Sequence, residues 1–131
     1  MTSPQIKIDF LTILLSVGCL TVGMLIGSYL GQSSLAEAKL QELQETHFWA
    51  HDNEDGTTFH DRRIKYAKNS EWAGENLYKG PCDIRNAMKL FEESPTHKAV
   101  LDHDYDTVEV QMEPIEGDED WCYGVFIFTS N

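Results

Sequence analysis

Basic residues are scarce in this sequence, and their scarcity excludes one large class of partners. Lysine and arginine together number 10 against 22 aspartates and glutamates, which gives a formal net charge of -12. Lys7 and Asp9 cancel within the first 33 residues, so the acidic surplus falls in the rest of the chain. Nucleic acid and anionic lipid headgroups bind to clustered cations, which this chain lacks. We expect no nucleic-acid partner and interpret the acidity as a solvated surface.

Cysteine is also rare, with 3 residues and no Cys-x-x-Cys pair. The absence of such a pair excludes a thioredoxin-like redox site and a zinc ribbon. Cys19 falls inside an apolar run, which leaves Cys82 and Cys122 as the candidates for a disulfide in the rest of the chain. The sequence equally allows these two to be unpaired, packed thiols.

Charged residues are absent from one long stretch, residues 10–30. Its length matches the roughly 20 apolar residues that a helix needs to cross a bilayer. A cleaved signal peptide is the alternative, although such peptides have a shorter apolar core with a small-residue cleavage site directly after it. We predict a short tail over 1–9, a single-pass membrane anchor over 10–31 and one domain over 33–131. The weak positive charge before the anchor predicts the N-terminus inside the cell membrane and the domain outside.

Glycine recurs every four residues in the predicted anchor, at Gly23, Gly27 and Gly31, with Cys19 one step earlier. This spacing makes one helix face smooth enough for a second backbone to approach closely. The pattern indicates either a homodimer formed through this face or the ordinary glycine content of membrane helices.

Helical patterns fill most of the domain, over 35–50, 59–67, 84–91 and 95–101. Ser34 and Glu37 have the form of a capping box at the start of the first. Asp83 can cap the third, and Ser94 with a proline after it can cap the fourth. Between the second and third helices we expect a polar loop that leads to Gly74.

Strand patterns follow the helices. Val108, Val110 and Met112 alternate with polar residues, which predicts a half-buried strand. The run 121–128 is aromatic and β-branched, which suits a central strand covered on both faces. The segment 114–120 is an acidic turn between the two. Helices first and an antiparallel sheet last predict the α+β class or a layered sandwich.

Four short pieces of the domain occur in a recognisable order. They are Phe48-Trp49-Ala50-His51, Asp55-Gly56-Thr57-Thr58, Ala73-Gly74-Glu75-Asn76-Leu77 and Ser94-Pro95-Thr96-His97. In this order they resemble the CAP domain, the superfamily of cysteine-rich secretory proteins, antigen 5 and pathogenesis-related proteins of group 1, in its bacterial, SCP-like form. The resemblance implies an α-β-α sandwich with an antiparallel sheet, in which the membrane anchor replaces the usual first helix.

The resemblance also implies a cleft lined by two histidines and two acids, which binds a divalent metal such as zinc in some members. Carried over to this chain, the cleft residues are His51, Glu75 and His97, with Glu93 as the nearest match to the second acid. The first three are the metal candidates.

The same residues support two kinds of chemistry on their own account. Two imidazoles and a carboxylate are ligands that zinc accepts, and they would leave one position open for water. They can equally form a charged hydrogen-bond network without a metal. Ser94 lies near His97 in sequence, but we interpret Ser94 as a helix cap rather than a nucleophile. No catalytic residue is predicted.

Three functions are compatible with these features. The leading one is a membrane-anchored extracytoplasmic binding module whose partner is an unidentified small molecule, lipid or envelope protein. The second is a metal-assisted hydrolase in which a cleft zinc activates water and Glu75 is the general base. The third is a structural subunit assembled through the glycine-rich transmembrane helix.

Overall fold

A computed structural model describes residues 34–131 of the chain. The predicted tail, the anchor over 10–31 and its glycine face at Gly23, Gly27 and Gly31 lie outside the described residues. Within residues 34–131, no helix has both the length and the apolar character needed to cross a membrane.

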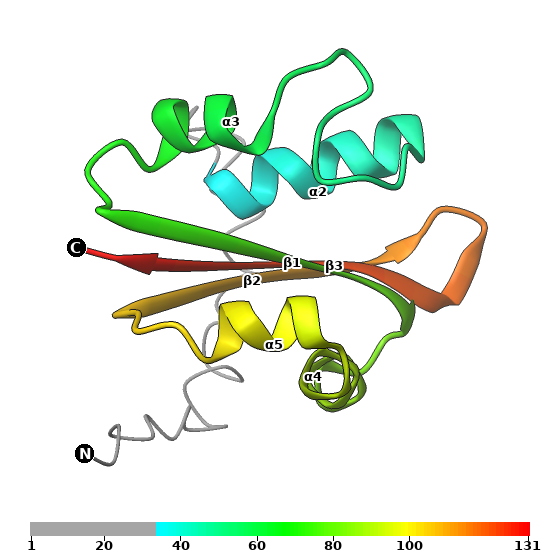
Figure 1. The fold of residues 1–131 in the computed structure, drawn as a ribbon. Coiled ribbons are helices and arrows are strands. Elements are labelled where there is room, and N and C mark those ends of the chain that lie inside the picture. The colour runs from blue at the N-terminus through cyan, green and yellow to red at the C-terminus, as the bar shows by residue number, and fades with distance from the viewer. Residues whose placement is uncertain (1–33) are drawn as a thin grey trace. The chain divides into compact units, whose positions relative to one another are not determined.

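The described chain alternates helices and strands around one sheet. Its elements are α2 (Leu35–Thr46), α3 (Phe59–Tyr66), β1 (Trp72–Pro81), α4 (Ile84–Glu93), α5 (Pro95–Leu101), β2 (Thr107–Ile115) and β3 (Asp118–Ser130). The three strands are antiparallel in the order β1-β3-β2. Figure 1 shows α2 and α3 on one face of the sheet and α4 and α5 on the other. The predicted α+β class is therefore confirmed, with the sheet as the middle layer.

Helix α2 covers one face of the sheet and begins where the sequence predicted. The Ser34 hydroxyl accepts from the Glu37 N–H, and the Glu37 carboxylate accepts from the Ser34 N–H. The expected extension to Ala50 is wrong, because His47 adopts a left-handed conformation with φ 56° and its N–H bonds to the Leu43 carbonyl. Residues 48–51 therefore lie outside the helix.

The two faces of β3 supply the two halves of the core. On one face, the buried cluster consists of Leu35, Ala36, Leu40, Leu43, Leu77, Tyr123, Val125 and Ile127. On the other face, Phe126 meets Phe91 of α4 edge-on with ring centroids 5.0 Å apart, and Phe128 meets Tyr105 in the same way. The prediction that 121–128 is a central strand covered on both faces is confirmed.

Strand β1 was not predicted. Its residues 72–81 pair with 121–130 of β3, although the sequence indicated a polar loop before Gly74. The apolar alternation that marks strands is broken there by Gly74, Glu75 and Asn76, all of which are buried. Glu75 and the Asn76 amide nitrogen find hydrogen-bond partners in Arg62 and the His97 carbonyl, whereas Asn76 Oδ1 is buried without a partner among residues 34–131.

Cys82 and Cys122 form a disulfide, with their Cα atoms 5.0 Å apart. The bond joins the residue after β1 to the middle of β3, next to the backbone pair of Gly80 and Cys122. The choice that the sequence left open is therefore decided in favour of a bridge.

Candidate functional site

Glu75 lies in β1 and turns its carboxylate toward the layer of α2 and α3. The side chain is 1% exposed, and Arg62 of α3, which is 3% exposed, pairs with it. Arg62 Nη1 donates to Glu75 Oε2 over 2.9 Å, and Nη2 donates to Oε1 over 3.3 Å. This bidentate contact neutralises the carboxylate, whose burial as an unpaired charge would cost much free energy.

His51 is the second member of this network. Its Nδ1 lies 2.9 Å from Glu75 Oε1, and its backbone carbonyl accepts a hydrogen bond from Arg62 Nη2. An ionised carboxylate can only accept, so Nδ1 carries the proton and Nε2 presents a lone pair in the neutral ring. The His51 side chain is 54% exposed, so this free nitrogen is accessible to solvent.

His97 approaches from the other layer, on α5. Its Nδ1 lies 2.8 Å from the Ser94 hydroxyl, and its ring stacks on Phe91 with centroids 5.3 Å apart. Burial lowers the pKa of His97, and repulsion between the His51 and His97 imidazoles when both are protonated lowers it further. The second effect indicates that the two imidazoles interact around the edge formed by β1.

The Gly-Glu-Asn piece of β1 connects the two layers because successive side chains of a strand alternate in direction. A Cβ on Gly74 would lie 2.8 Å from Cγ1 of Val100, so glycine lets α5 approach the strand. Glu75 faces Arg62 and His51, as described above. Asn76 donates through Nδ2 to the His97 carbonyl over 3.1 Å and thereby ties α5 to β1.

Ser94 occupies the predicted N-cap position of α5, but its hydroxyl does not cap the helix. The hydroxyl instead contacts His97 Nδ1 at 2.8 Å and the Thr96 hydroxyl at 3.3 Å. The expected cap is therefore replaced by a contact that orients the His97 ring. The proline in the first turn has no N–H, so the start of the helix carries one unpaired donor fewer.

Among residues 34–131, no hydrogen bond or ion pair joins Glu93, carried over as a fourth cleft residue, to His51, Glu75 or His97. Glu93 lies at the end of α4 with its side chain 60% exposed, and its carboxylate is 4.0 Å from Lys89 Nζ. The structure therefore brings His51 and Glu75 into contact, places His97 beside them in the other layer, and leaves Glu93 at the surface.

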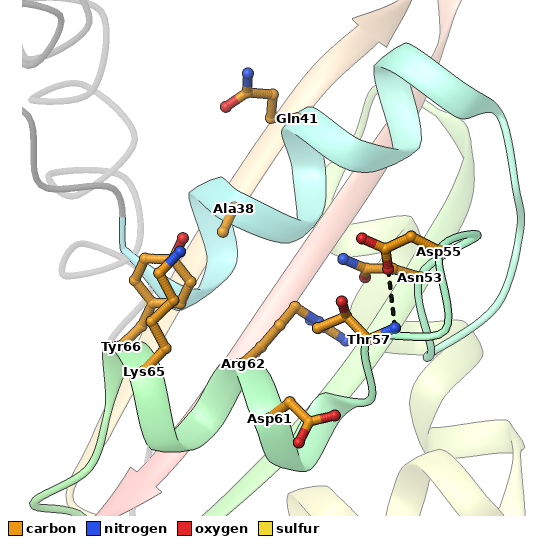
Figure 2. A pocket seen from close by; sticks show the side chains of 9 residues that line it. All are labelled: Ala38, Gln41, Asn53, Asp55, Thr57, Asp61, Arg62, Lys65 and Tyr66. Atoms are coloured by element: carbon orange, nitrogen blue, oxygen red, sulfur yellow. Dashed lines mark hydrogen bonds between the residues drawn. The ribbon is translucent and has the colours of Figure 1, made fainter.

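A separate pocket, with a volume of about 420 Å³, lies between α2, α3 and the loop 53–57. Figure 2 shows Gln41 on the α2 side, Asn53 and Asp55 on the loop, and Lys65 and Tyr66 on α3. Arg62 also lines this pocket, so one arginine belongs both to the pocket and to the Glu75 network.

Comparison with known proteins relates this geometry to a fold. No protein-family model matches the chain, and no curated protein matches it. Two solved structures do. An outer surface protein from Borrelia burgdorferi has a TM-score of 0.61 and 22% identity, over 74% of this chain and 71% of that one. An extracellular protein containing a SCP domain from Bacillus anthracis str. Ames has a TM-score of 0.56 and 22% identity, over 74% of this chain and 30% of that one.

The described domain has a CAP-like fold. This confirms the fold that the four sequence pieces implied. The match covers 30% of the Bacillus chain, which is much longer than this domain. The three pieces that contain His51, Glu75 and His97 meet at the edge of β1 in this CAP-like domain.

The residues do not fit a metal site in the way the resemblance implied. Among residues 34–131, no group of three His, Cys, Asp or Glu side chains is placed to hold a metal ion. Both Glu75 oxygens are engaged by Arg62 and His51, and His97 belongs to the opposite layer with its Nδ1 on Ser94. A guanidinium therefore supplies the positive charge beside Glu75.

Sequence reasoning missed Arg62. One signal was available, since Phe59, Arg62 and Tyr66 recur at a spacing of three and four residues and share one helix face. Phe59 and Tyr66 pack against the core, and the Arg62 guanidinium lies 5.5 Å from the centre of the Phe59 ring. A charge between two apolar positions of one face needs a buried partner, and Glu75 is that partner.

Proposed function

We propose that this chain is a membrane-anchored, extracytoplasmic CAP-like binding module that contacts its ligand through His51, Glu75 and His97. The observation that carries the proposal is the fixed Glu75. Its carboxylate holds His51 Nδ1 at 2.9 Å while the His51 ring remains 54% exposed. An oriented imidazole with one free nitrogen is a preformed contact for a polar ligand.

Binding is favoured over hydrolysis by the state of the carboxylate. A general base must accept a proton from water, yet Glu75 is almost fully buried and receives hydrogen bonds on both oxygens. The Ser94 and His97 pair lacks the third member of a catalytic triad, since within residues 34–131 no carboxylate hydrogen-bonds to His97.

The extracytoplasmic location rests on redox chemistry and on the neighbours. A structural disulfide such as Cys82–Cys122 persists in oxidising compartments outside the cytosol. The two structural neighbours are described as an outer surface protein and an extracellular protein. The apolar residues 10–30 would hold the domain at the membrane, and α2 begins at Leu35, a few residues after them.

Binding is tested on the full chain in detergent micelles by NMR of the His51 and His97 side chains. Acetamide, acetate and zinc chloride are the probes, because they represent a neutral polar group, an anion and a metal. We expect saturable shifts with acetamide or acetate that disappear in the double variant His51→Ala/His97→Ala. Zinc bound at one equivalent and lost in each single variant would instead support the metal-dependent hydrolase. No shift with any probe would reject a ligand site at these residues.

The anchor is tested by fractionation of cells that express the full chain. We expect the protein in the membrane fraction after high-salt and carbonate washes, with the domain digested by protease added to intact cells or spheroplasts. A variant with Leu14→Arg and Leu15→Arg places two charges in the apolar run and should release the protein. Full protection from protease would reverse the proposed orientation.

Assembly through the glycine face is a separate proposal, tested with Cys19. If Gly23, Gly27 and Gly31 line a helix pair, an oxidant should cross-link Cys19 between two chains in native membranes. Gly27→Leu should abolish the cross-link, whereas a leucine on another face, at Ser28, should not. Absence of the cross-link in the wild type would leave the binding module as a monomer.

A further inference from the structure

The pocket between α2, α3 and the loop 53–57 is lined by both hydrogen-bond donors and hydrogen-bond acceptors. Asp55 and Asp61 present carboxylates that accept, Lys65 presents an ammonium that donates, and the Gln41 amide does both. The volume of about 420 Å³ is in the range of small-molecule sites. Among the described residues, no aliphatic side chain longer than alanine lines it, so an apolar ligand would find few apolar contacts there.

The pocket is lined by charged groups of both signs. Two carboxylates, Asp55 and Asp61, face two cations, Arg62 and Lys65. The N–H groups of Thr57 and Thr58 lower the pKa values of Asp55 and Asp61 respectively, so both stay ionised at neutral pH. The charge of Arg62 is already matched by Glu75. Asp55 and Asp61 therefore exceed Lys65 by one negative charge, so the pocket disfavours a phosphate or carboxylate and can accept an uncharged polar ligand.

The loop that forms one wall is held in place before any ligand arrives. Lys39, which is fully buried, donates to the Asp52 carbonyl over 3.2 Å and to Asn53 Oδ1 over 3.4 Å. Glu42 accepts from the Glu54 N–H over 2.9 Å. The turn closes on itself through the bond from the Asn53 N–H to the Thr57 carbonyl, 2.8 Å long. Because the wall is already ordered, little conformational entropy is lost on binding.

One wall of the pocket is aromatic. Tyr66 ends α3 and is partly buried against the core, and Lys65 Nζ lies 5.0 Å from the centre of its ring. An aromatic ring beside carboxylates and amides matches a pyranose sugar, which has an apolar C–H face and a rim of hydroxyl groups. Each hydroxyl can donate to a carboxylate and accept from an ammonium or amide at the same time.

We propose that this pocket is a saccharide subsite that binds a neutral sugar unit between Gln41, the Asn53–Asp55 turn and the Lys65–Tyr66 end of α3. The site is distinct from the His51, Glu75 and His97 group, which the proposed function uses. Its ligand belongs to the neutral polysaccharides or oligosaccharides of a cell envelope, recognised by hydroxyl groups and not by charge.

The experiment is an NMR titration of the full chain in zwitterionic micelles, since detergents with sugar headgroups would compete. The probes are maltose and N,N′-diacetylchitobiose. We expect saturable shifts of the backbone amides of 53–57 and 61–66, with a Kd on the order of 1 mM, as is usual for a single small sugar site. Glucose 6-phosphate should bind about tenfold more weakly, which corresponds to about 1.4 kcal/mol.

Two variants locate the binding. Gln41→Ala and Lys65→Ala remove exposed pocket groups without disturbing the buried core, and each should weaken the saccharide about tenfold. Lys68→Ala, which removes an exposed cation just beyond α3, is the matched control and should change nothing. Absence of saturable shifts, wild-type shifts retained in both pocket variants, or tighter binding of the phosphorylated sugar would overturn the proposal.

The same spectra separate this proposal from the proposed function. Saccharide at the pocket should leave the His51 and His97 imidazole signals unchanged, whereas acetamide or acetate should move them. If the saccharide shifts only the imidazoles, the subsite is wrong and the ligand belongs to the histidine group. If the pocket amides respond and the imidazoles respond to no probe, the subsite stands alone and the first proposal fails.

Discussion

Arg62 and Glu75 form an ion pair whose side chains are only 3% and 1% exposed. The pair joins α3 to β1, and the same guanidinium donates to the carbonyl of His51 in the segment after α2. Three successive segments of the chain are therefore fixed to one another by a single planar group. The Nε of Arg62 is buried and has no hydrogen-bond partner within the described residues, so all of the pairing runs through its two terminal nitrogens.

Arg62→Met should destabilise the domain strongly because it leaves the Glu75 charge buried without its main partner. We expect a loss of about 3 to 5 kcal/mol in the free energy of unfolding. Urea unfolding of residues 33–131 measures it, since the core of this unit is built from its own residues.

Two further variants control that measurement. Arg62→Met/Glu75→Gln removes both charges and should be more stable than Arg62→Met alone. Lys89→Met breaks the exposed pair with Glu93, where the side chains are 73% and 60% exposed, and should cost less than about 1 kcal/mol. A cost for Arg62→Met as small as that for Lys89→Met would show that the buried pair is not the link we describe.

His97 should titrate below the ordinary histidine pKa of about 6.5. Burial is the larger cause of the lowered pKa, and repulsion between the His51 and His97 imidazoles when both are protonated adds to it. His51→Ala removes the second cause and should raise the pKa of His97, measured from its imidazole signals between about pH 4 and pH 9. His60→Ala, at an exposed position of α3, is the control and should leave the value unchanged.

The same shift predicts how stability depends on pH. A folded-state pKa below the unfolded value means that the native state favours neutral His97. Its contribution is therefore present above about pH 6.5 and is lost as the pH falls through the lowered native pKa. An acid limb that is unchanged in His97→Gln would contradict this assignment.

Glu109→Gln should stabilise the domain at pH 7. Burial raises the pKa of Glu109 above its usual range, although hydrogen bonds from the Ser34 hydroxyl and the Ala36 N–H oppose the shift. The native state therefore favours the protonated acid, whose contribution is present below the ordinary value of about 4.3 and lost as pH rises through the raised native pKa.

Unfolding in urea at pH 5 and pH 7 measures this effect. The gain from Glu109→Gln should be larger at pH 7 than at pH 5. Glu113→Gln changes the net charge equally on the same strand and serves as the control. If both variants gain the same stability at pH 7, the effect is one of net charge and the burial of Glu109 does not matter.

Loss of the Cys82–Cys122 disulfide should cost about 4 kcal/mol. The two cysteines are separated by 40 positions in sequence, and the chain-entropy estimate for a loop of that size gives this magnitude. Cys82→Ser/Cys122→Ser, unfolded in urea, measures the loss. A reducing agent should destabilise the wild-type domain and leave the double variant unaffected. Equal stability of wild type and variant would show that the disulfide does not stabilise the domain.

The candidate site was partly accessible from the sequence. His51, Glu75 and His97 were predicted from the resemblance to the CAP domain, because the short pieces that carry the resemblance are visible in the sequence. Arg62 was missed because a buried ion pair depends on contact between α3 and β1. Neither segment contains a local pattern that predicts this contact. Strand β1 was missed for the same reason, since Glu75 and the Asn76 amide nitrogen find their partners in other layers.

By itself, the sequence determined the helix starts, the central strand and the class of fold. Capping and hydrophobic periodicity act over a few residues, so the chain carries them locally. Tertiary structure alone decided the rest. It paired Cys82 with Cys122, set Arg62 against Glu75, and formed a polar pocket lined by the same arginine. The reason is physical, because the free energy of a buried charge depends on which distant group neutralises it.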